Sequence, residues 1–255
     1  MAFPEQLAPH AQTSPTSLAR REEARRRLIV ALDVPSADAA IELVDRLEDS
    51  CQWLKIGLEL FSAAGPGIVQ RLVARGHSIF LDLKFHDIPN TVAGAIRSAA
   101  GLGVRMMTMH ALGGPAMLAA ARAEVEKIPN PPQLLGVTVL TSMDAKQLSA
   151  VGVAASPAQA AERLAQLGLD VGIRGFVCSP QEVSALRTIT GPEGVLVVPG
   201  IRPAGAAMGD QKRVASPAET LRQGANFLVV GRPITQAVNP AEAARQILEE
   251  MVTAL

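Results

Sequence analysis

Aromatic residues are scarce in this chain of 255 residues, which has no tyrosine, one tryptophan and an aromatic content of 3%. A surface that binds single-stranded nucleic acid usually stacks bases on several aromatic side chains, and this chain offers few. No charge of one sign is in excess either, because 24 basic and 24 acidic residues cancel. We therefore expect no nucleic-acid partner and a small molecule as the ligand.

Cysteines and long apolar runs are also few. Cys51 and Cys178 cannot build a disulfide scaffold and do not form a Cys-x-x-Cys pair, so we expect two buried structural side chains in a reducing compartment. No apolar run approaches the roughly 20 residues of a membrane span. The N-terminus lacks the basic-then-apolar order of a signal peptide. We expect no membrane association and a cytoplasmic location.

Short apolar or β-branched runs alternate with alanine-rich helical segments from residue 28 onward. Residues 1–27 differ, being rich in Pro, Ser, Thr, Ala and Arg without an apolar stripe, and we expect a mobile or docked extension outside the core. The eight runs are LIVALD (28–33), WLKIG (53–57), SIFLDL (78–83), VRMMTMH (104–110), LLGVTVL (134–140), RGFVCS (174–179), VLVVPG (195–200) and NFLVVG (226–231). Each run is expected to be a strand followed by a helix.

The spacing of these runs predicts the fold. The strand ends fall near residues 33, 57, 82, 109, 140, 178, 199 and 231, so one repeat takes about 28 residues, a normal length for one β/α unit. Eight such units describe a single-domain α/β protein with a (β/α)₈ TIM barrel over residues 28–255. A doubly wound open sheet competes, but it would normally carry a phosphate-binding glycine turn after its first strand, and ALDVPSAD has none.

The strand ends are unusually polar. In (β/α)₈ barrels the chemistry lies on the loops at the carboxyl ends of the strands. The residues at these ends are Asp33, Lys55, Asp82, Lys84, His110, Thr141 and Ser142. Because side chains alternate along a strand, Asp82 and Lys84 should point the same way into the barrel mouth and touch. Asp87 lies beyond the strand, where periodicity does not settle its position and a second subunit is within reach.

Glycine and arginine follow the last two strands. PGIR at 199–202 and VVGR at 229–232 each place a glycine and an arginine after a buried run, and barrels commonly bind phosphate at their seventh and eighth loops. The glycine lets backbone N–H groups approach an anion, while Arg202 or Arg232 can bond its oxygens. Residues 201–217 form a long polar segment suited to a lid. We expect a phosphorylated substrate.

These motifs together resemble one enzyme family. DLKFHDIPNT at 82–91 is similar to the signature of bacterial-type orotidine 5′-phosphate decarboxylases, the last enzyme of de novo UMP synthesis. Six further segments resemble motifs of the family and occur in the family's order: VALD (30–33), LKIG (54–57), LTS (140–142), PGIRP (199–203), GDQ (209–211) and GRPIT (231–235). The resemblance covers residues 28 to about 240.

The resemblance implies a homodimeric barrel that removes CO₂ from orotidine 5′-phosphate without a metal or an organic cofactor. It implies that Lys84 protonates pyrimidine C6 and that Asp82 lies beside the departing CO₂. It also implies that Lys55 holds Asp82 and the ribose hydroxyls, and that Asp87 comes from the partner subunit. The other implied substrate-binding residues are Asp33 and Thr91 for the ribose, with Thr91 also reaching across the dimer, Thr141 and Ser142 for the pyrimidine, and Arg202, Gln211, Gly231 and Arg232 for the lid and phosphate.

Two alternatives stay open at this point. One is a related phosphosugar aldolase or decarboxylase, which carries a similar Asp-x-Lys-x-x-Asp motif and normally needs magnesium; Phe85, His86 and the Ile-Pro-Asn-Thr sequence argue against it. The sequence has no His-Glu-x-x-His or Cys-x-x-Cys metal pattern. The other is a non-catalytic nucleotide-binding barrel. We interpret His86 as an outward turn residue, and the role of His110 stays open.

Overall fold

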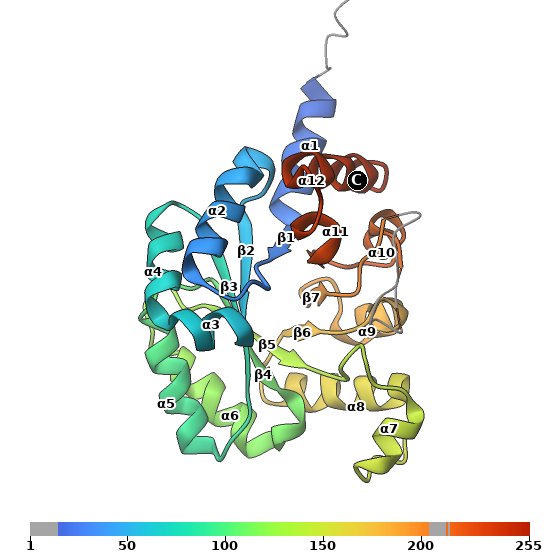
Figure 1. Cartoon of the computed structure of the whole chain (residues 1–255). Coiled ribbons are helices and arrows are strands. Elements are labelled where there is room, and N and C mark those ends of the chain that lie inside the picture. The colour runs from blue at the N-terminus through green and yellow to red at the C-terminus, as the bar shows by residue number, and fades with distance from the viewer. Residues whose placement is uncertain (1–14, 204–212, 214) are drawn as a thin grey trace, which may run out of the picture.

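The fold is a closed barrel of eight parallel strands in sequence order (Figure 1). The computed structural model describes residues 15–203, 213 and 215–255. The strands are β1 (Leu28–Ala31), β2 (Trp53–Gly57), β3 (Ser78–Phe85), β4 (Met106–His110), β5 (Gln133–Val137), β6 (Gly175–Val177), β7 (Val195–Val198) and β8 (Phe227–Val230). Pairing of β1 with β8 closes the barrel. The (β/α)₈ prediction is confirmed, and the open-sheet alternative is wrong.

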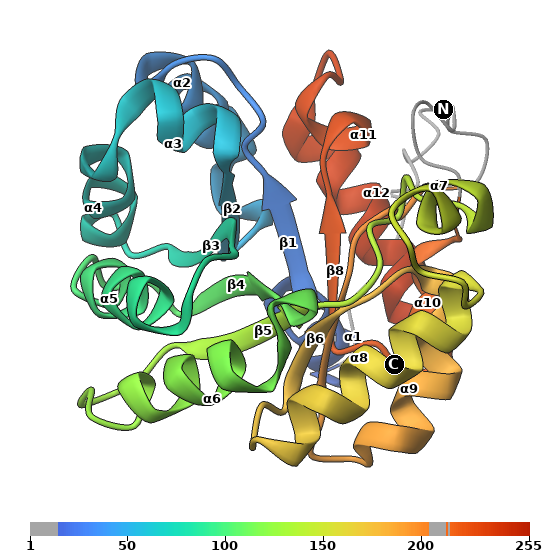
Figure 2. The same cartoon turned by 90° about the horizontal axis from the view of Figure 1, so that it is seen from below.

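Helices surround the barrel as an outer layer (Figure 2). The α-helices are α1 (Pro15–Arg27), α2 (Ala37–Leu47), α3 (Leu58–Ala64), α4 (Pro66–Ala74), α5 (Pro89–Ala100), α6 (Gly114–Val125), α7 (Ala145–Ala150), α8 (Pro157–Asp170), α9 (Val183–Thr190), α10 (Pro217–Arg222), α11 (Arg232–Thr235) and α12 (Pro240–Val252). Three 3₁₀ turns are η1 (Glu48–Ser50), η2 (Ala111–Gly113) and η3 (Pro180–Glu182).

Local sequence sets where these helices begin. At the start of α8, the Ser156 side chain accepts a hydrogen bond from the Gln159 amide, and the Gln159 side chain accepts one from the Ser156 amide. Pro157 occupies the first helical turn, where its missing N–H costs nothing. Asn239 caps α12 in a similar way, by accepting from the Glu242 amide at 3.0 Å.

The core has two layers. Inside the barrel, inward-facing side chains form a packed plug of Ile29, Ala31, Phe80, Met106, Leu135, Val197 and Val229. A larger apolar layer lies between the strands and the helices, and it contains both cysteines. Cys51 and Cys178 are buried, as predicted, and burial raises the pKa of both thiols to about 12. Trp53 packs edge-on against Phe227 with ring centroids 5.3 Å apart.

Two strands end three residues away from their predicted ends, and the others end within two residues of theirs. β5 stops at Val137, three residues before the predicted end at 140. The carbonyls of Val139 and Leu140 accept hydrogen bonds from the Arg213 guanidinium instead of continuing a strand. β3 continues to Phe85, three residues past the predicted end at 82, because Phe85 still pairs with Met109 of β4 beyond an irregularity in the ladder.

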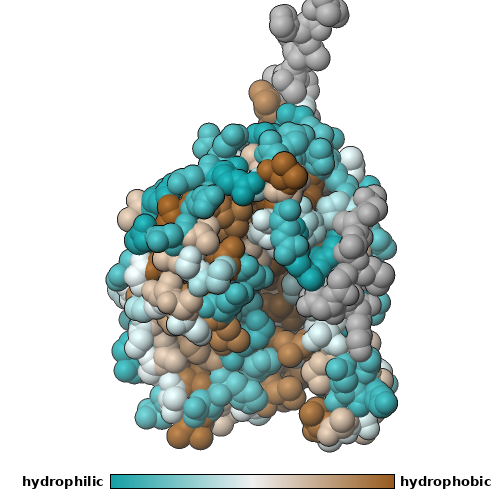
Figure 3. Space-filling model, viewed as in Figure 1, coloured by the Kyte–Doolittle hydropathy of each residue, from teal (hydrophilic) through white to brown (hydrophobic). Residues whose placement is uncertain are grey.

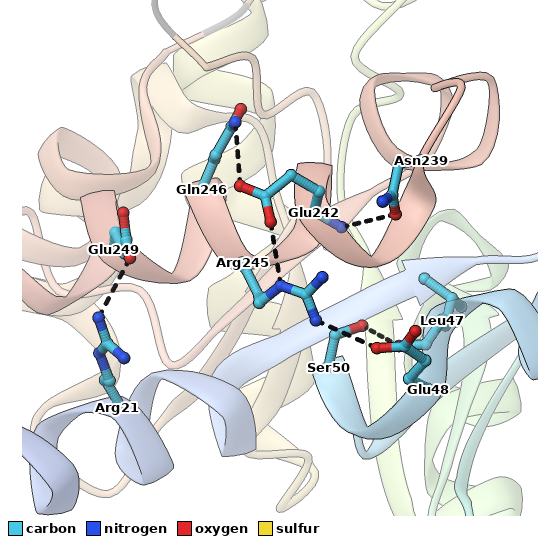
Figure 4. Close-up of polar contacts among 9 residues, drawn as sticks. All are labelled: Arg21, Leu47, Glu48, Ser50, Asn239, Glu242, Arg245, Gln246 and Glu249. Atoms are coloured by element: carbon cyan, nitrogen blue, oxygen red, sulfur yellow. Dashed lines mark hydrogen bonds and ion pairs between the residues drawn. The ribbon is translucent and has the colours of Figure 1, made fainter.

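The helix α1 precedes the barrel and lies beside α12 (Figures 1 and 4). Arg21 of α1 pairs with Glu249 of α12 at 3.1 Å, and Ala24 is fully buried. Exposed ion pairs of this kind contribute little stability, so the buried part of the α1 contact matters more. The prediction that residues 1–27 form an extension separate from residues 28–255 stays a prediction; residues 1–14 lie outside the described part of the chain.

A cavity of about 460 Å³ lies between α1, η1 and α12, at the end of the barrel where the strands begin. Three arginines line it, and each has an acidic partner. Arg21 pairs with Glu249, and Arg245 pairs with Glu48 and Glu242 (Figure 4). Arg25 pairs with Glu22. Because these cations are already paired, we assign no ligand to this cavity, although it is larger than the cavity at the barrel mouth.

Candidate active site

Four charged side chains form a row of alternating sign at the barrel mouth. Lys55 Nζ lies 2.9 Å from Asp33 Oδ1 and 3.8 Å from Asp82 Oδ2. Lys84 Nζ donates to both oxygens of Asp82 at 2.9 Å. The predicted contact between Asp82 and Lys84 is therefore present. The order along the row is Asp33, Lys55, Asp82, Lys84.

Three neighbouring strands build this row. Asp33 follows β1, Lys55 lies on β2, and Asp82 and Lys84 lie on β3. Lys55 is paired in register with Ala31 of β1, so its ammonium reaches Asp33 just beyond the end of β1. The side chains of Lys55 and Asp82 are only 11% and 14% exposed. Charges so poorly hydrated are tolerated because each has an opposite neighbour.

The geometry of β3 at this point differs from the simple alternation predicted from sequence. Lys84 has φ +52°, in the left-handed region that non-glycine residues rarely adopt. The register of β3 against β4 shifts between Leu81 and Phe85. Asp82 and Lys84 thus meet through a distorted segment and not through a regular strand.

One polar residue beside this segment was missed in the sequence analysis. Thr108 of β4 is fully buried, and its hydroxyl lies 2.9 Å from both the Lys84 amide nitrogen and Asp82 Oδ1. The available signal was a lone threonine among the methionines of VRMMTMH, two residues before His110. The sequence alone does not say that this threonine faces Asp82.

A cavity of about 280 Å³ opens at the ends of β1, β2, β7 and β8. Its lining includes Asp33, Lys55, Gly200, Arg202, Gly231 and Arg232. Figure 3 shows the molecule from the side of these strand ends, hollowed at its centre. The predicted anion-binding glycines and arginines therefore share one hollow with half of the charged row. Gly200 has φ +81°, a conformation that favours glycine. Gln211 lies outside the described residues.

Thr141 and Ser142 follow β5 on the same rim, Thr141 partly buried and Ser142 exposed. The loop before them is fixed by the buried Arg213, whose Nη2 donates to the carbonyl of Leu140 at 2.9 Å. Arg213 also forms an ion pair with buried Glu182, and Glu182 accepts from the Ser179 amide at 2.7 Å. Burial lowers the pKa of the Arg213 guanidinium. This anchor, also missed from sequence, ties the ends of β5 and β6 together.

Asp87 and Thr91 lie on the outer side of the rim and are exposed. The Asp87 carboxylate accepts from the Ile88 amide at 2.6 Å. Both residues line a cavity of about 320 Å³ together with Lys84. Within one chain, Asp87 thus lies near Lys84, but its carboxylate bonds to the adjacent backbone amide of Ile88.

The two histidines of the rim lie close together. The rings of His86 and His110 have centroids 5.5 Å apart. His86 is exposed, while His110 is partly buried and its Nδ1 has no hydrogen-bond partner among the described residues. Burial lowers the pKa of His110, and the nearby His86 and Lys84 lower it further. Both effects disfavour the charged form of the His110 imidazole.

Within residues 15–203, 213 and 215–255, no cluster of three or more His, Cys, Asp or Glu side chains is arranged to hold a metal ion. A search of the same residues for a helix with the length and apolarity of a membrane span found none.

Comparison with known proteins decides the family. Residues 26–247 match the Orotidine 5'-phosphate decarboxylase / HUMPS family. The chain belongs to this family. Among its relatives, the orotidine 5'-phosphate decarboxylase of Nitrosococcus oceani is 52% identical over 227 residues, which are 89% of this chain and 98% of the relative. That of Moorella thermoacetica is 50% identical over 237 residues, 91% of this chain and 94% of the relative.

A solved structure from the family has the same fold. The crystal structure of orotidine 5'-phosphate decarboxylase from Lactobacillus acidophilus superposes with a TM-score of 0.79 at 36% identity. The match covers 89% of this chain and 99% of that chain. The resemblance found in the sequence motifs is thus confirmed along nearly the whole barrel.

Proposed function

We propose that this chain converts orotidine 5′-phosphate to UMP and CO₂, with Lys84 as the proton donor and without a cofactor. The observation that carries the proposal is the alternating row of Asp33, Lys55, Asp82 and Lys84 at the barrel mouth. Relatives of about 50% identity, aligned over nearly their whole length, carry the name of this activity. The last step of de novo pyrimidine biosynthesis is the corresponding place in metabolism.

The chemistry requires a cation close to C6. When the bond between C6 and the carboxylate breaks, its electron pair stays on C6 in an orbital that the ring cannot delocalise. A fixed ammonium there stabilises the developing charge more than it stabilises the substrate. Lys84 then transfers a proton to C6, forming the C6–H bond of UMP, and regains a proton from solvent.

Asp82 has two roles in this proposal. Its carboxylate holds the Lys84 ammonium through two hydrogen bonds of 2.9 Å. It would also lie beside the substrate carboxylate, where repulsion is relieved as CO₂ leaves. Lys55, 3.8 Å from Asp82 and 2.9 Å from Asp33, would hold both acids and the ribose hydroxyls.

The remaining substrate contacts are proposed from position on the rim. Asp33 and Thr91 would bind the ribose, Thr141 and Ser142 the pyrimidine. Arg202, Gly231 and Arg232 would bind the phosphate in the cavity that they line, and Gln211 stays a prediction. Phosphate binding far from C6 can still accelerate the reaction, because its binding energy can organise the charged row.

A homodimer with shared sites is part of the proposal. Three large apolar side chains are at least half exposed just beyond the ends of β2, β3 and β4: Leu58 (56%), Ile88 (68%) and Leu112 (50%). These strands are neighbours in the barrel, so the side chains lie on one side of the rim, where Asp87 and Thr91 are also exposed. A second copy covering this side would bury them. The cytoplasmic location stays a prediction.

The test is conversion of orotidine 5′-phosphate by the full chain in excess chelator. We expect UMP to form at the same rate with and without chelator, because no step of the proposed mechanism uses a metal ion. Separation of substrate and UMP by chromatography gives the readout. Strict dependence on added magnesium would instead support the phosphosugar aldolase alternative, and no UMP under either condition would overturn the proposed function.

A further inference from the structure

The pairing of β3 with β4 contains extra residues beside the charged row. Leu81 pairs with Met107 and Phe85 pairs with Met109. Residues 82–84 of β3 therefore face a single residue of β4, Thr108. Such a bulge re-aims side chains and interrupts the ladder of backbone hydrogen bonds.

The bulge places Lys84 in a strained conformation that needs a local partner. Its φ of +52° lies in the left-handed region, which side chains with a Cβ disfavour. The Lys84 amide, which a regular ladder would pair with a backbone carbonyl, donates to Thr108 Oγ1 at 2.9 Å. The threonine hydroxyl thus replaces the missing backbone partner.

The same hydroxyl also orients the acid. Thr108 Oγ1 donates to Asp82 Oδ1 at 2.9 Å, and that oxygen also accepts from Lys84 Nζ at 2.9 Å. A hydroxyl has one proton to give. Because the oxygen accepts from the Lys84 amide, its proton is directed at Asp82. The contacts close a ring through the hydroxyl, the carboxylate, the ammonium and the amide.

The ring is rigid because of where Thr108 lies. Its side chain has no exposed surface, and it sits on the neighbouring strand, with its flanking residues Met107 and Met109 also fully buried. Threonine is stiff about its first side-chain torsion. The packed β4 therefore fixes the position of the hydroxyl.

We propose that Thr108 is a positioning residue for the reaction, holding the Asp82 carboxylate and the strained Lys84 backbone in the geometry that aims the ammonium at the substrate. The inference rests on the proposed function. Thr108 does not itself touch the reacting atoms. It acts through the two residues that do, so its loss should lower turnover more than substrate binding.

The experiment compares Thr108→Val with Thr108→Ser and the wild type, measuring kcat and KM for orotidine 5′-phosphate. Valine keeps the shape and removes the hydroxyl, whereas serine keeps the hydroxyl. We expect kcat of Thr108→Val to fall about 10- to 100-fold, the loss typical of a catalytic group misplaced by about 1 Å. KM should stay within about 3-fold, because the cavity that holds the proposed phosphate site is lined by other strands. Thr108→Ser should keep kcat within about 3-fold of the wild type.

A matched control removes a buried threonine hydroxyl elsewhere. Thr190 is 5% exposed at the end of α9, before β7 begins and hence at the opposite end of the barrel. Thr190→Val should leave kcat unchanged. Thermal melting of each variant checks folding. If Thr108→Val does not fold, Thr108→Cys is compared with Thr108→Ser. A thiol is similar in size to a hydroxyl but forms only weak hydrogen bonds. We therefore expect a lower kcat for the cysteine variant than for the serine variant.

Unchanged kcat in folded Thr108→Val, or equal kcat for the serine and cysteine variants, would overturn the positioning role. A serine variant as impaired as the valine variant would also overturn it. Failure of the proposed function looks different, because the wild type itself would then produce no UMP.

Discussion

Lys84→Ala is expected to lower kcat for orotidine 5′-phosphate by about 10⁴-fold or more, because one ammonium supplies both the charge opposite C6 and the proton. Binding of UMP should be largely kept, since the proposed phosphate contacts come from the ends of β7 and β8. Steady-state kinetics and calorimetric titration with UMP measure the two effects separately. A large loss of kcat with retained affinity is the signature of an interaction made in the transition state.

The control for this variant is Lys127→Ala, which removes a lysine whose side chain is 69% exposed and lies far from the mouth, after α6. It should keep the activity of the wild type. A non-catalytic nucleotide-binding barrel makes the opposite prediction, because loss of Lys84 would then change nothing that can be measured as turnover. Retained turnover in folded Lys84→Ala would remove the lysine from the mechanism.

Mixed dimers of Asp87→Ala and Lys84→Ala subunits should regain activity that neither variant has alone. If Asp87 acts in the partner's site, each heterodimer contains one site with both residues intact. Random exchange makes about half of the dimers mixed, with one working site out of two, so about one quarter of wild-type activity should return. The prediction rests on the exposed position of Asp87 beyond β3.

Subunit exchange has to be shown independently in this experiment, for example by co-purification of an untagged subunit with a tagged one. Each variant mixed with itself is the control and should stay inactive. Full exchange without return of activity would mean that Asp87 serves the site of its own chain, and the shared-site proposal would then fail.

Much of the barrel could be predicted because its information is local. Each strand is a short apolar run, and helices such as α8 begin at a serine followed by proline, with a glutamine at the third position. Closure then gathers the strand ends on one rim, so Asp33, Lys55 and Asp82 could be grouped without knowing any distance. The contact between Asp82 and Lys84 was predicted from regular alternation along a strand and is present, although a distorted segment of β3 makes it.

The parts that could not be predicted depend on how two distant segments pair. The bulge in β3 is a shift in its register with β4. Nothing in SIFLDLKF marks where this register shift occurs. Thr108 is functional in our proposal only because of that mismatch. Arg213 is similar, since its partners Glu182, Val139 and Leu140 come from other parts of the chain.

The most direct test of the central claim is a crystal structure with a UMP analogue that carries an anionic oxygen at C6. The proposed mechanism requires Lys84 Nζ within about 3 Å of that oxygen, a normal distance for a charge-assisted hydrogen bond. Asp82 should still bond the lysine, and the phosphate should lie beside Arg232. Two results would contradict the proposed role of Lys84: an analogue bound at the barrel mouth with the Lys84 ammonium turned away from C6, or an analogue bound outside the barrel mouth.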